Sequence, residues 1–246
     1  MTWAEIGLLM LGALAGGFVN GLTGFGTALT AVPIWLQVLP HAQAGALGAA
    51  AGCTGQIMTL HLIRHAIDWR KVTPFVVAGL AGVPVGTWLL PMIDARLFKL
   101  GVGAVLVLYC GFCLVAPKLS PVLGGLGGPW ADALVGFGGG VMSGIAGLAG
   151  PLPIIWATFK PWSRDEKRAL FQVFNFTILG ATLVSSAAAG LLPRSFWTIA
   201  ALIVPATFVG VTLGGHVYRR LDDRRFDRLV LAILFCTGIA LIAANL

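Results

Sequence analysis

Charged residues are missing from long stretches of this chain, and this feature restricts its fold more than any other. No Asp, Glu, Lys or Arg occurs between Glu5 and Arg64, and further gaps run between residues 71 and 94, 132 and 160, 168 and 194, and 194 and 219. A helix of about 20 apolar residues crosses a bilayer core of roughly 30 Å, so each gap can hold a membrane span. The sequence therefore predicts an all-α, polytopic integral membrane protein.

Composition excludes several other classes of protein. Only 10% of the residues are charged, against about 25% in ordinary soluble domains. Strands of a membrane β-barrel alternate apolar and polar residues, whereas these stretches are apolar on every side. The net charge of +7 comes from short loops beside the apolar stretches, where the positive-inside rule explains it, so we expect lipid and no nucleic acid as a partner. All four cysteines lie in apolar stretches, so we expect no disulfide framework, no metal and no cofactor.

Pro and Gly residues divide the chain into two halves within a single transmembrane domain. Residues 1–116 form the first half and residues 131–246 the second, with a Pro- and Gly-rich connector at 117–130. The first apolar run has no Lys or Arg before it, so we expect it to belong to the mature protein and not to a cleaved signal peptide. Each half is predicted to open with a glycine-rich element and to continue with three ordinary spans. The predicted elements are 6–38, 43–63, 74–92 and 97–116, then 131–159, 169–192, 196–217 and 229–245.

The two halves are similar enough to predict an internal repeat. A shift of about 128 residues places the pair Gly82 and Gly86 on Gly210 and Gly214. The loops after residues 159 and 217 are strongly basic, which predicts that both are cytoplasmic. The halves are then inverted and both termini lie outside the cytoplasm, with a parallel repeat as the alternative. A shift of 123 residues matches the glycine-rich elements, placing Gly17, Asn20, Gly21 and Gly24 on Gly140, Ser143, Gly144 and Gly147.

The glycine-rich elements are predicted to break and not to run as straight helices. Each glycine in a helix interior costs about 1 kcal/mol relative to Ala, and each element has several within a dozen residues. We expect the breaks at Gly24 and Gly147, near the bilayer midplane. The free N–H groups and the positive dipole end after each break suit a small anion. The predicted substrate contacts are Asn20, Gly21, Thr23, Gly24, Gly26, Thr27, Ser143, Gly144, Gly147, Gly150, Gln172 and Asn175.

Candidates for coupling are few. No Asp or Glu lies within a predicted span, which removes the usual carboxylate for proton or sodium coupling. His61 and His65, one helical turn apart, are the paired titratable candidates. Two other functional classes stay open. A membrane thiol oxidoreductase could use the C-x-x-C of Cys110 and Cys113, and a non-transporting subunit of a larger complex would also explain the missing carboxylates.

The glycine-rich elements also carry a recognisable motif. Its first copy retains Gly17, Gly21, Gly24, Gly26 and Pro33, with Thr27 and Ala28 where further glycines are common. Its second copy retains Gly140, Gly144 and Gly147 and departs at Ala149, Gly150 and Pro151. With the turn at residues 68–70, this pattern resembles the TauE/SafE family of sulfite and organosulfonate exporters over essentially the whole chain. The resemblance implies a secondary transporter, not an enzyme, that carries a small anion across the inner membrane, with sulfite or an organosulfonate favoured. The transport direction and a homo-oligomeric state stay open.

Overall fold

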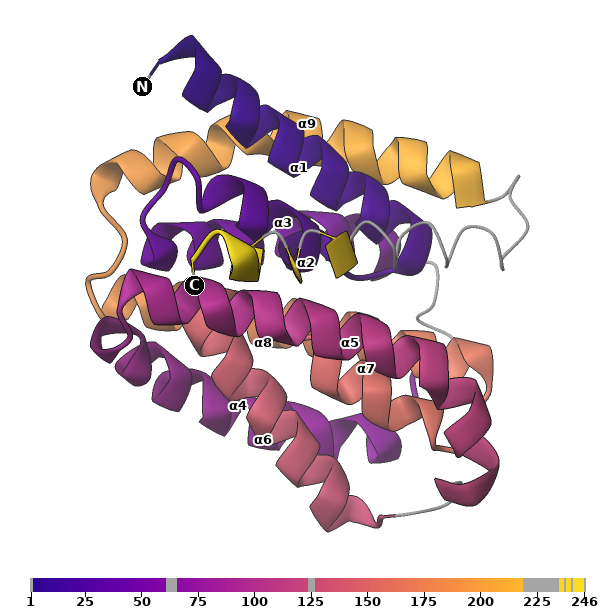
Figure 1. Ribbon diagram of the computed structural model, residues 1–246. Helices are drawn as coiled ribbons and strands as arrows, with labels where there is room; N and C mark the ends of the chain where they lie inside the picture. The colour runs from indigo at the N-terminus through magenta and orange to yellow at the C-terminus, as the bar shows by residue number, and fades with distance from the viewer. Residues whose placement is uncertain are drawn as a thin grey trace.

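The computed structural model describes residues 2–60, 66–123, 127–218, 235–236, 238–239 and 241–245. Every element within these residues is helical, which confirms the all-α prediction (Figure 1). The helices are α1 (Trp3–Thr23), α2 (Thr27–Trp35), α3 (His41–Leu60), α4 (Trp69–Leu89), η2 (Leu90–Met92), α5 (Ala95–Leu123), α6 (Pro129–Ala146), α7 (Pro151–Thr158), α8 (Arg164–Ala188) and α9 (Arg194–Tyr218).

Five of these helices are long and apolar enough to cross a membrane. They are α1, α4 with η2, α5, α8 and α9. The connector is shorter than predicted, because α5 continues through Pro117 and Pro121 to Leu123 and α6 already begins at Pro129. His61, His65 and part of the predicted last span, at residues 229–234, 237 and 240, lie outside the described residues.

Polar capping residues fix where several helices begin. Thr2 and Glu5 form a reciprocal capping box at the start of α1. Ser163 and Glu166 form the same arrangement at the start of α8, and the Asp68 side chain accepts a hydrogen bond from the Arg70 N–H at the start of α4. Each cap satisfies N–H groups that a helix leaves without partners in its first turn. The polar clusters of the sequence therefore mark helix ends.

Each glycine-rich element folds into a helical hairpin. In the first, α2 returns along α1, and the Trp35 indole N–H donates to the Leu9 carbonyl at 3.0 Å. In the second, α7 returns along α6, and the Trp156 indole N–H donates to Asp132 at 2.6 Å. Lys160 pairs with the same carboxylate at 2.7 Å, and both charged residues are buried. Each hairpin thus enters and leaves at one end of the bundle.

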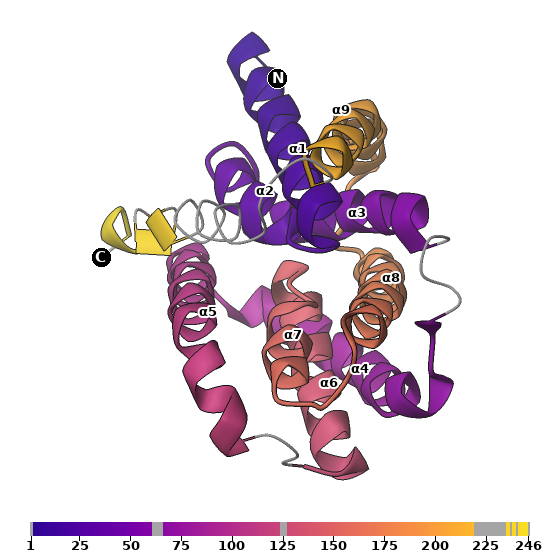
Figure 2. The same cartoon turned by 90° about the vertical axis from the view of Figure 1, so that its right-hand side faces the viewer.

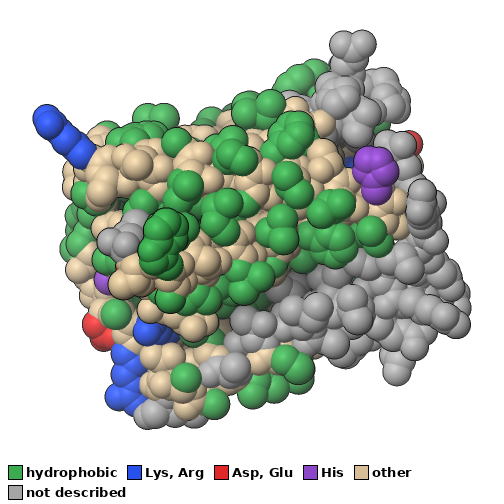
Figure 3. Space-filling model, turned by 90° about the horizontal axis from the view of Figure 1, so that it is seen from above, with side chains coloured by type: hydrophobic (Ala, Val, Ile, Leu, Met, Phe, Trp, Pro, Cys, Tyr) green, Lys and Arg blue, Asp and Glu red, His purple; other side chains and the backbone are tan. Residues whose placement is uncertain are grey.

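The two ends of the bundle differ in charge. One end, called the basic end, holds Lys71, Lys160, Lys167 and Arg168, where Lys71 pairs with Glu166 between α4 and α8. At the opposite end the Arg96 side chain donates to the carbonyl of Asn245, and Figure 1 places both termini there. On the face drawn in Figure 3, hydrophobic side chains cover the middle, and charged side chains lie toward the ends. This distribution suits a protein whose middle lies in lipid.

Each hairpin packs on a helix from the other half of the chain (Figure 2). A Cβ at Gly21 of α1 would overlap the Val211 carbonyl of α9, and a Cβ at Gly144 of α6 would overlap the Val83 carbonyl of α4. These two contacts coincide under the shifts of 123 and 128 residues. Glycines are therefore needed at both crossings for close backbone approach. The match supports the repeat, which stays a prediction.

Candidate functional site

The first glycine-rich element breaks at Gly24, as predicted. Gly24 and Gly26 have φ angles of 81° and 90°, in the left-handed region that favours glycine. The Gly24 N–H still donates to the Asn20 carbonyl at 2.7 Å, so it closes α1. The chain then turns through Phe25, and α2 begins at Thr27.

The second element breaks at Gly147, again as predicted. Its φ angle is 68°, and its N–H donates to the Ser143 carbonyl at 2.7 Å. The chain continues through Gly150, and α7 begins at Pro151. The backbone arrangement is therefore the same at Gly24 and Gly147: a helix ends on a left-handed glycine, and a short helix then runs in the opposite direction.

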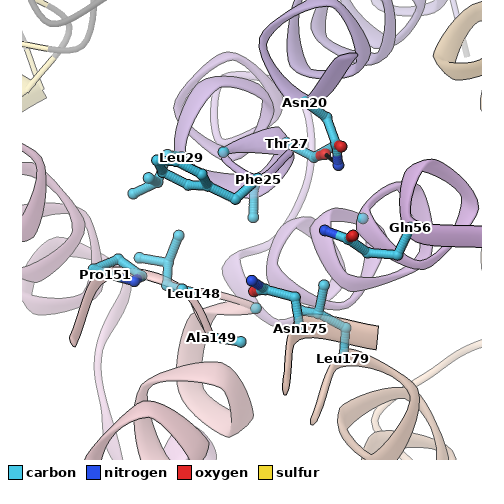
Figure 4. Close-up of a pocket in the computed structure, with 15 residues that line it drawn as sticks. Asn20, Phe25, Thr27, Leu29, Gln56, Leu148, Ala149, Pro151, Asn175 and Leu179 are labelled. Atoms are coloured by element: carbon cyan, nitrogen blue, oxygen red, sulfur yellow. Dashed lines mark hydrogen bonds between the residues drawn. The ribbon is translucent and has the colours of Figure 1, made fainter. Parts of the chain in front are cut away.

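A small cavity lies between the two breaks (Figure 4). Its volume of about 20 Å³ is enough for roughly one water molecule. The central helices α3 and α8 complete the wall, which places the cavity where both hairpins and both central helices meet. Its lining consists of Asn20, Phe25, Gly26, Thr27, Ala28, Leu29, Gly52, Gln56, Gly147, Leu148, Ala149, Gly150, Pro151, Asn175 and Leu179.

Buried amides supply most of the polar side-chain groups of this lining. Asn20 donates through Nδ2 to the Thr27 hydroxyl at 2.7 Å, which ties α1 to α2 across the break. Gln56 of α3 donates through Nε2 to the Gly24 carbonyl at 2.9 Å. Asn175 of α8 donates to the Phe171 carbonyl one turn earlier at 2.7 Å. These bonds hold the amides at the cavity wall, and no described lining residue is charged.

The two breaks differ in the backbone N–H groups that the helix after each break leaves without a helical partner. The first bond of α2 runs from the Thr30 N–H to the Gly26 carbonyl at 3.1 Å. The N–H groups of residues 27–29, all in the lining, therefore precede the hydrogen bonding of the helix. At the second break, Pro151 and Pro153 occupy the first turn of α7 and have no N–H to offer. The helix start at α2 is the stronger donor of the two.

The structure brings half of the predicted contacts to the cavity. Asn20, Gly26, Thr27, Gly147, Gly150 and Asn175 line it. Six others lie outside this lining for identifiable reasons. Gly21 and Gly144 lie at helix crossings, and the Thr23 hydroxyl donates to the carbonyls of Val19 in α1 and Phe25 in the break. The Ser143 hydroxyl pairs with Thr182 at 2.7 Å. Gly24 lies behind the lining, where Gln172 approaches it.

Sequence reasoning misses two polar residues near the breaks. Gln56 lies in a Gly- and Ala-rich helix, where a single amide interrupts a small-residue run. The charge pattern assigns Arg168 to a basic loop, yet it belongs to α8 and its Nε lies 3.7 Å from the position that a Cβ would take at Gly24. Arg168, Gln172 and Asn175 follow each other at helical spacing, and this periodicity could have revealed one polar face.

Comparison with known proteins gives one family match. A family model described as "Sulfite exporter TauE/SafE" matches residues 8–241. Neither the curated proteins nor the solved structures contain a match to the chain. The matched range includes the second hairpin, the first hairpin from residue 8 onward and every residue of the cavity lining.

Proposed function

Because the chain belongs to the TauE/SafE sulfite exporter family, a family of membrane transporters and not of enzymes, we propose that its own cargo is sulfite or an organosulfonate. We further propose that this anion binds in the cavity between the two breaks. One observation carries the proposal: buried amides from three helices and the open start of α2 line one small cavity. Family membership also removes the thiol oxidoreductase alternative, and neither Cys110 nor Cys113 lines the cavity.

The cavity suits an oxyanion because it can offer several donors without a fixed charge. The N–H groups at the start of α2 point along the positive end of its dipole. Asn20 contributes as well, since the Thr27 hydroxyl can donate or accept. The Asn20 amide can therefore turn over, keep its bond to Thr27 and present its N–H groups to the anion. Hydrogen bonds to a charged group are worth about 1.5–3 kcal/mol each.

Transport requires the cavity to widen. A space for about one water molecule is smaller than sulfite, which has four heavy atoms, so the structure corresponds to a closed form. Phe25 and Leu29 from the first hairpin face Leu148 from the second across the cavity (Figure 4). We propose that the hairpins move apart at the glycine breaks, which opens the cavity toward one end at a time.

We propose that the two ends of the bundle face the two sides of an inner membrane. Under the positive-inside rule the basic end faces the cytoplasm. Both termini then lie outside, each glycine-rich hairpin enters and leaves on one side, and the two halves are inverted. A reporter active only in the cytoplasm, fused after Leu246, is expected to be inactive. An active fusion would overturn this topology.

A vesicle assay tests the proposed function. The purified protein is reconstituted, and the fluxes of sulfite, sulfoacetate, taurine and thiosulfate are measured with protein-free vesicles as the control. We expect saturable flux of at least one of these anions. No flux of any of them would contradict the proposal and favour the alternative of a non-transporting subunit, in particular if the protein co-purifies with a partner.

A further inference from the structure

Gln172 is a buried amide whose bonding the cavity does not explain. Its side chain is 0% exposed, and neither its Nε2 nor its Oε1 has a hydrogen-bond partner. Burying such a group without a partner costs about 1–3 kcal/mol, and most buried polar side chains are therefore bonded. Gln172 lies outside the lining of the central cavity. The Gln172 amide therefore lowers the stability of the protein, and it makes no hydrogen bond within the fold that would explain its presence.

The Gln172 amide and the Arg168 guanidinium point to the same place. Nε2 of Gln172 lies 3.6 Å and Nε of Arg168 lies 3.7 Å from the position that a Cβ would take at Gly24. The two residues are one helical turn apart on α8, and Asn175 follows at the cavity. These three polar side chains thus form a line along α8 from the basic end to the central cavity.

Arg168 places a positive charge next to the first break. The left-handed Gly24 has no side chain, and the atoms within 4 Å of the position that a Cβ would take there are polar nitrogens of Gln172 and Arg168. A guanidinium binds oxyanions through strong charge-assisted hydrogen bonds, and the N–H groups of an amide beside it can donate further bonds to the same anion.

We propose that Arg168, Gln172 and the backbone at Gly24 form an entry site for the substrate at the basic-end side of the cavity. We also propose that this site selects a monoanion that carries a hydrogen-bond donor of its own, such as hydrogensulfite. The unpartnered Gln172 amide offers both a donor and an acceptor, and an acceptor-only dianion would satisfy only the donor. The inference rests on the proposed transport of sulfite or an organosulfonate. Its consequence is that the substrate brings a proton with it through a cavity without carboxylates.

Gln172→Met tests the entry site, because methionine has nearly the same length without polar atoms. Sulfite flux is measured in vesicles of known orientation, with Lys167→Gln as the control that removes a neighbouring positive charge from the same helix. We expect Gln172→Met to raise KM about tenfold or more for sulfite presented at the basic end, with a melting temperature equal to or above that of the wild type. Lys167→Gln should keep the wild-type KM.

Several outcomes would overturn the entry site. An unchanged KM in Gln172→Met would do so, as would a large fall in melting temperature, since the amide would then be structural. Gln172→Leu provides a second variant if Gln172→Met does not fold. Absence of flux in the wild type would instead contradict the proposed function, so the two failures are distinguishable.

The pH dependence tests the selection of a donor-bearing monoanion. Near neutral pH the concentration of hydrogensulfite falls as that of the sulfite dianion rises. We expect KM calculated from hydrogensulfite to stay constant with pH, while KM calculated from total sulfite rises. A KM for total sulfite that does not change with pH would contradict the selection. The double variant His61→Gln and His65→Gln examines the paired coupling candidates of the sequence, and loss of the pH dependence there would assign the proton to the histidines and overturn the inference.

Discussion

The two glycine breaks have matching backbones but different surroundings. At Gly24, the groups nearest to the position that a Cβ would take are the side chains of Gln172 and Arg168, at 3.6 and 3.7 Å. At Gly147, the corresponding position would overlap the Gly45 carbonyl and lie 3.2 Å from the Ala49 N atom. The first break is thus surrounded by polar side chains, whereas the second is packed directly on the backbone of α3.

The same contrast continues at the cavity wall. Gly52 and Gln56 of α3 correspond to Asn175 and Leu179 of α8 under the shift of 123 residues, and all four line the cavity. Each helix therefore contributes one amide to the cavity wall, but the two amides do not occupy equivalent positions of the repeat. A repeated backbone can thus provide a site with approximate symmetry, while its side chains provide unsymmetrical chemistry. We infer that the first hairpin binds the anion and that the second provides a rigid surface opposite it.

Substitutions of the residues that close the two hairpins should differ most in their effect on the free energy of unfolding. Lys160→Met leaves Asp132 buried without its cationic partner, and we expect a loss of roughly 3–5 kcal/mol in unfolding free energy. Trp35→Phe removes the neutral bond to the Leu9 carbonyl and part of a fully buried ring, so we expect a smaller loss of about 2 kcal/mol. Denaturant unfolding in detergent measures both. Equal losses would mean that the two hairpins are closed by similar interactions after all.

Substitution of the glycines at the two breaks should give the next largest difference in stability. Gly147→Ala adds both a left-handed alanine and an overlap with the Gly45 carbonyl, so we expect it to destabilise the protein by roughly 3 kcal/mol. Gly24→Ala adds the left-handed strain alone, about 1–2 kcal/mol. Melting temperatures of the two purified variants provide the comparison. If Gly24→Ala is the less stable variant, the first break is the more tightly packed one and the contrast is wrong.

Substrate affinity should respond differently to substitution of Asn20 at the first break and of Ser143, its counterpart, at the second. Asn20→Ala removes an amide from the cavity, and we expect KM to rise about tenfold. Ser143→Ala breaks the bond to Thr182, which should cost about 1 kcal/mol of stability and leave KM unchanged. Cys110→Ala, on α5, is the control for both measurements. A similar rise in KM for Asn20→Ala and Ser143→Ala would show that both breaks contact the anion.

The smallest effect concerns the missing N–H groups of α7. Pro151→Ala introduces one N–H at the cavity wall, at a helix start where such a group adds about 0.3–1 kcal/mol to anion binding. We therefore expect KM to fall about two- to fivefold, with little change in stability. Flux measurements at substrate concentrations below KM have the required sensitivity. An unchanged or higher KM would indicate that the second break does not face the anion in the bound state.

The membrane-spanning helices and the positions of the two breaks could be predicted from the sequence, because both depend on the local composition of the chain. Charge gaps define spans, and clustered glycines exclude a continuous helix around Gly24 and Gly147. Partner choice depends on tertiary packing and could not be predicted in the same way. Gly21 is next to Asn20 in the first glycine-rich element, and Ser143 is the counterpart of Asn20 in the second, yet Gly21 faces α9 and Ser143 faces Thr182. The helical structure of residues 117–123 could not be predicted either, because Pro117 and Pro121 are ordinarily signs of a break.

The exchange of helices between the two halves has a consequence for synthesis of the chain. Gly79 of α4 and Gly140 of α6 are roughly 60 residues apart, whereas Gly17 of α1 and Thr207 of α9 are roughly 190 apart. At about 5–20 residues per second, the ribosome completes the first of these pairs within roughly 3–12 s and the second only after roughly 10–40 s. The first hairpin therefore enters the bilayer long before its partner exists. A nascent chain that stops before α9 leaves the glycine surface of α1 uncovered, which is a suitable feature for quality control to detect.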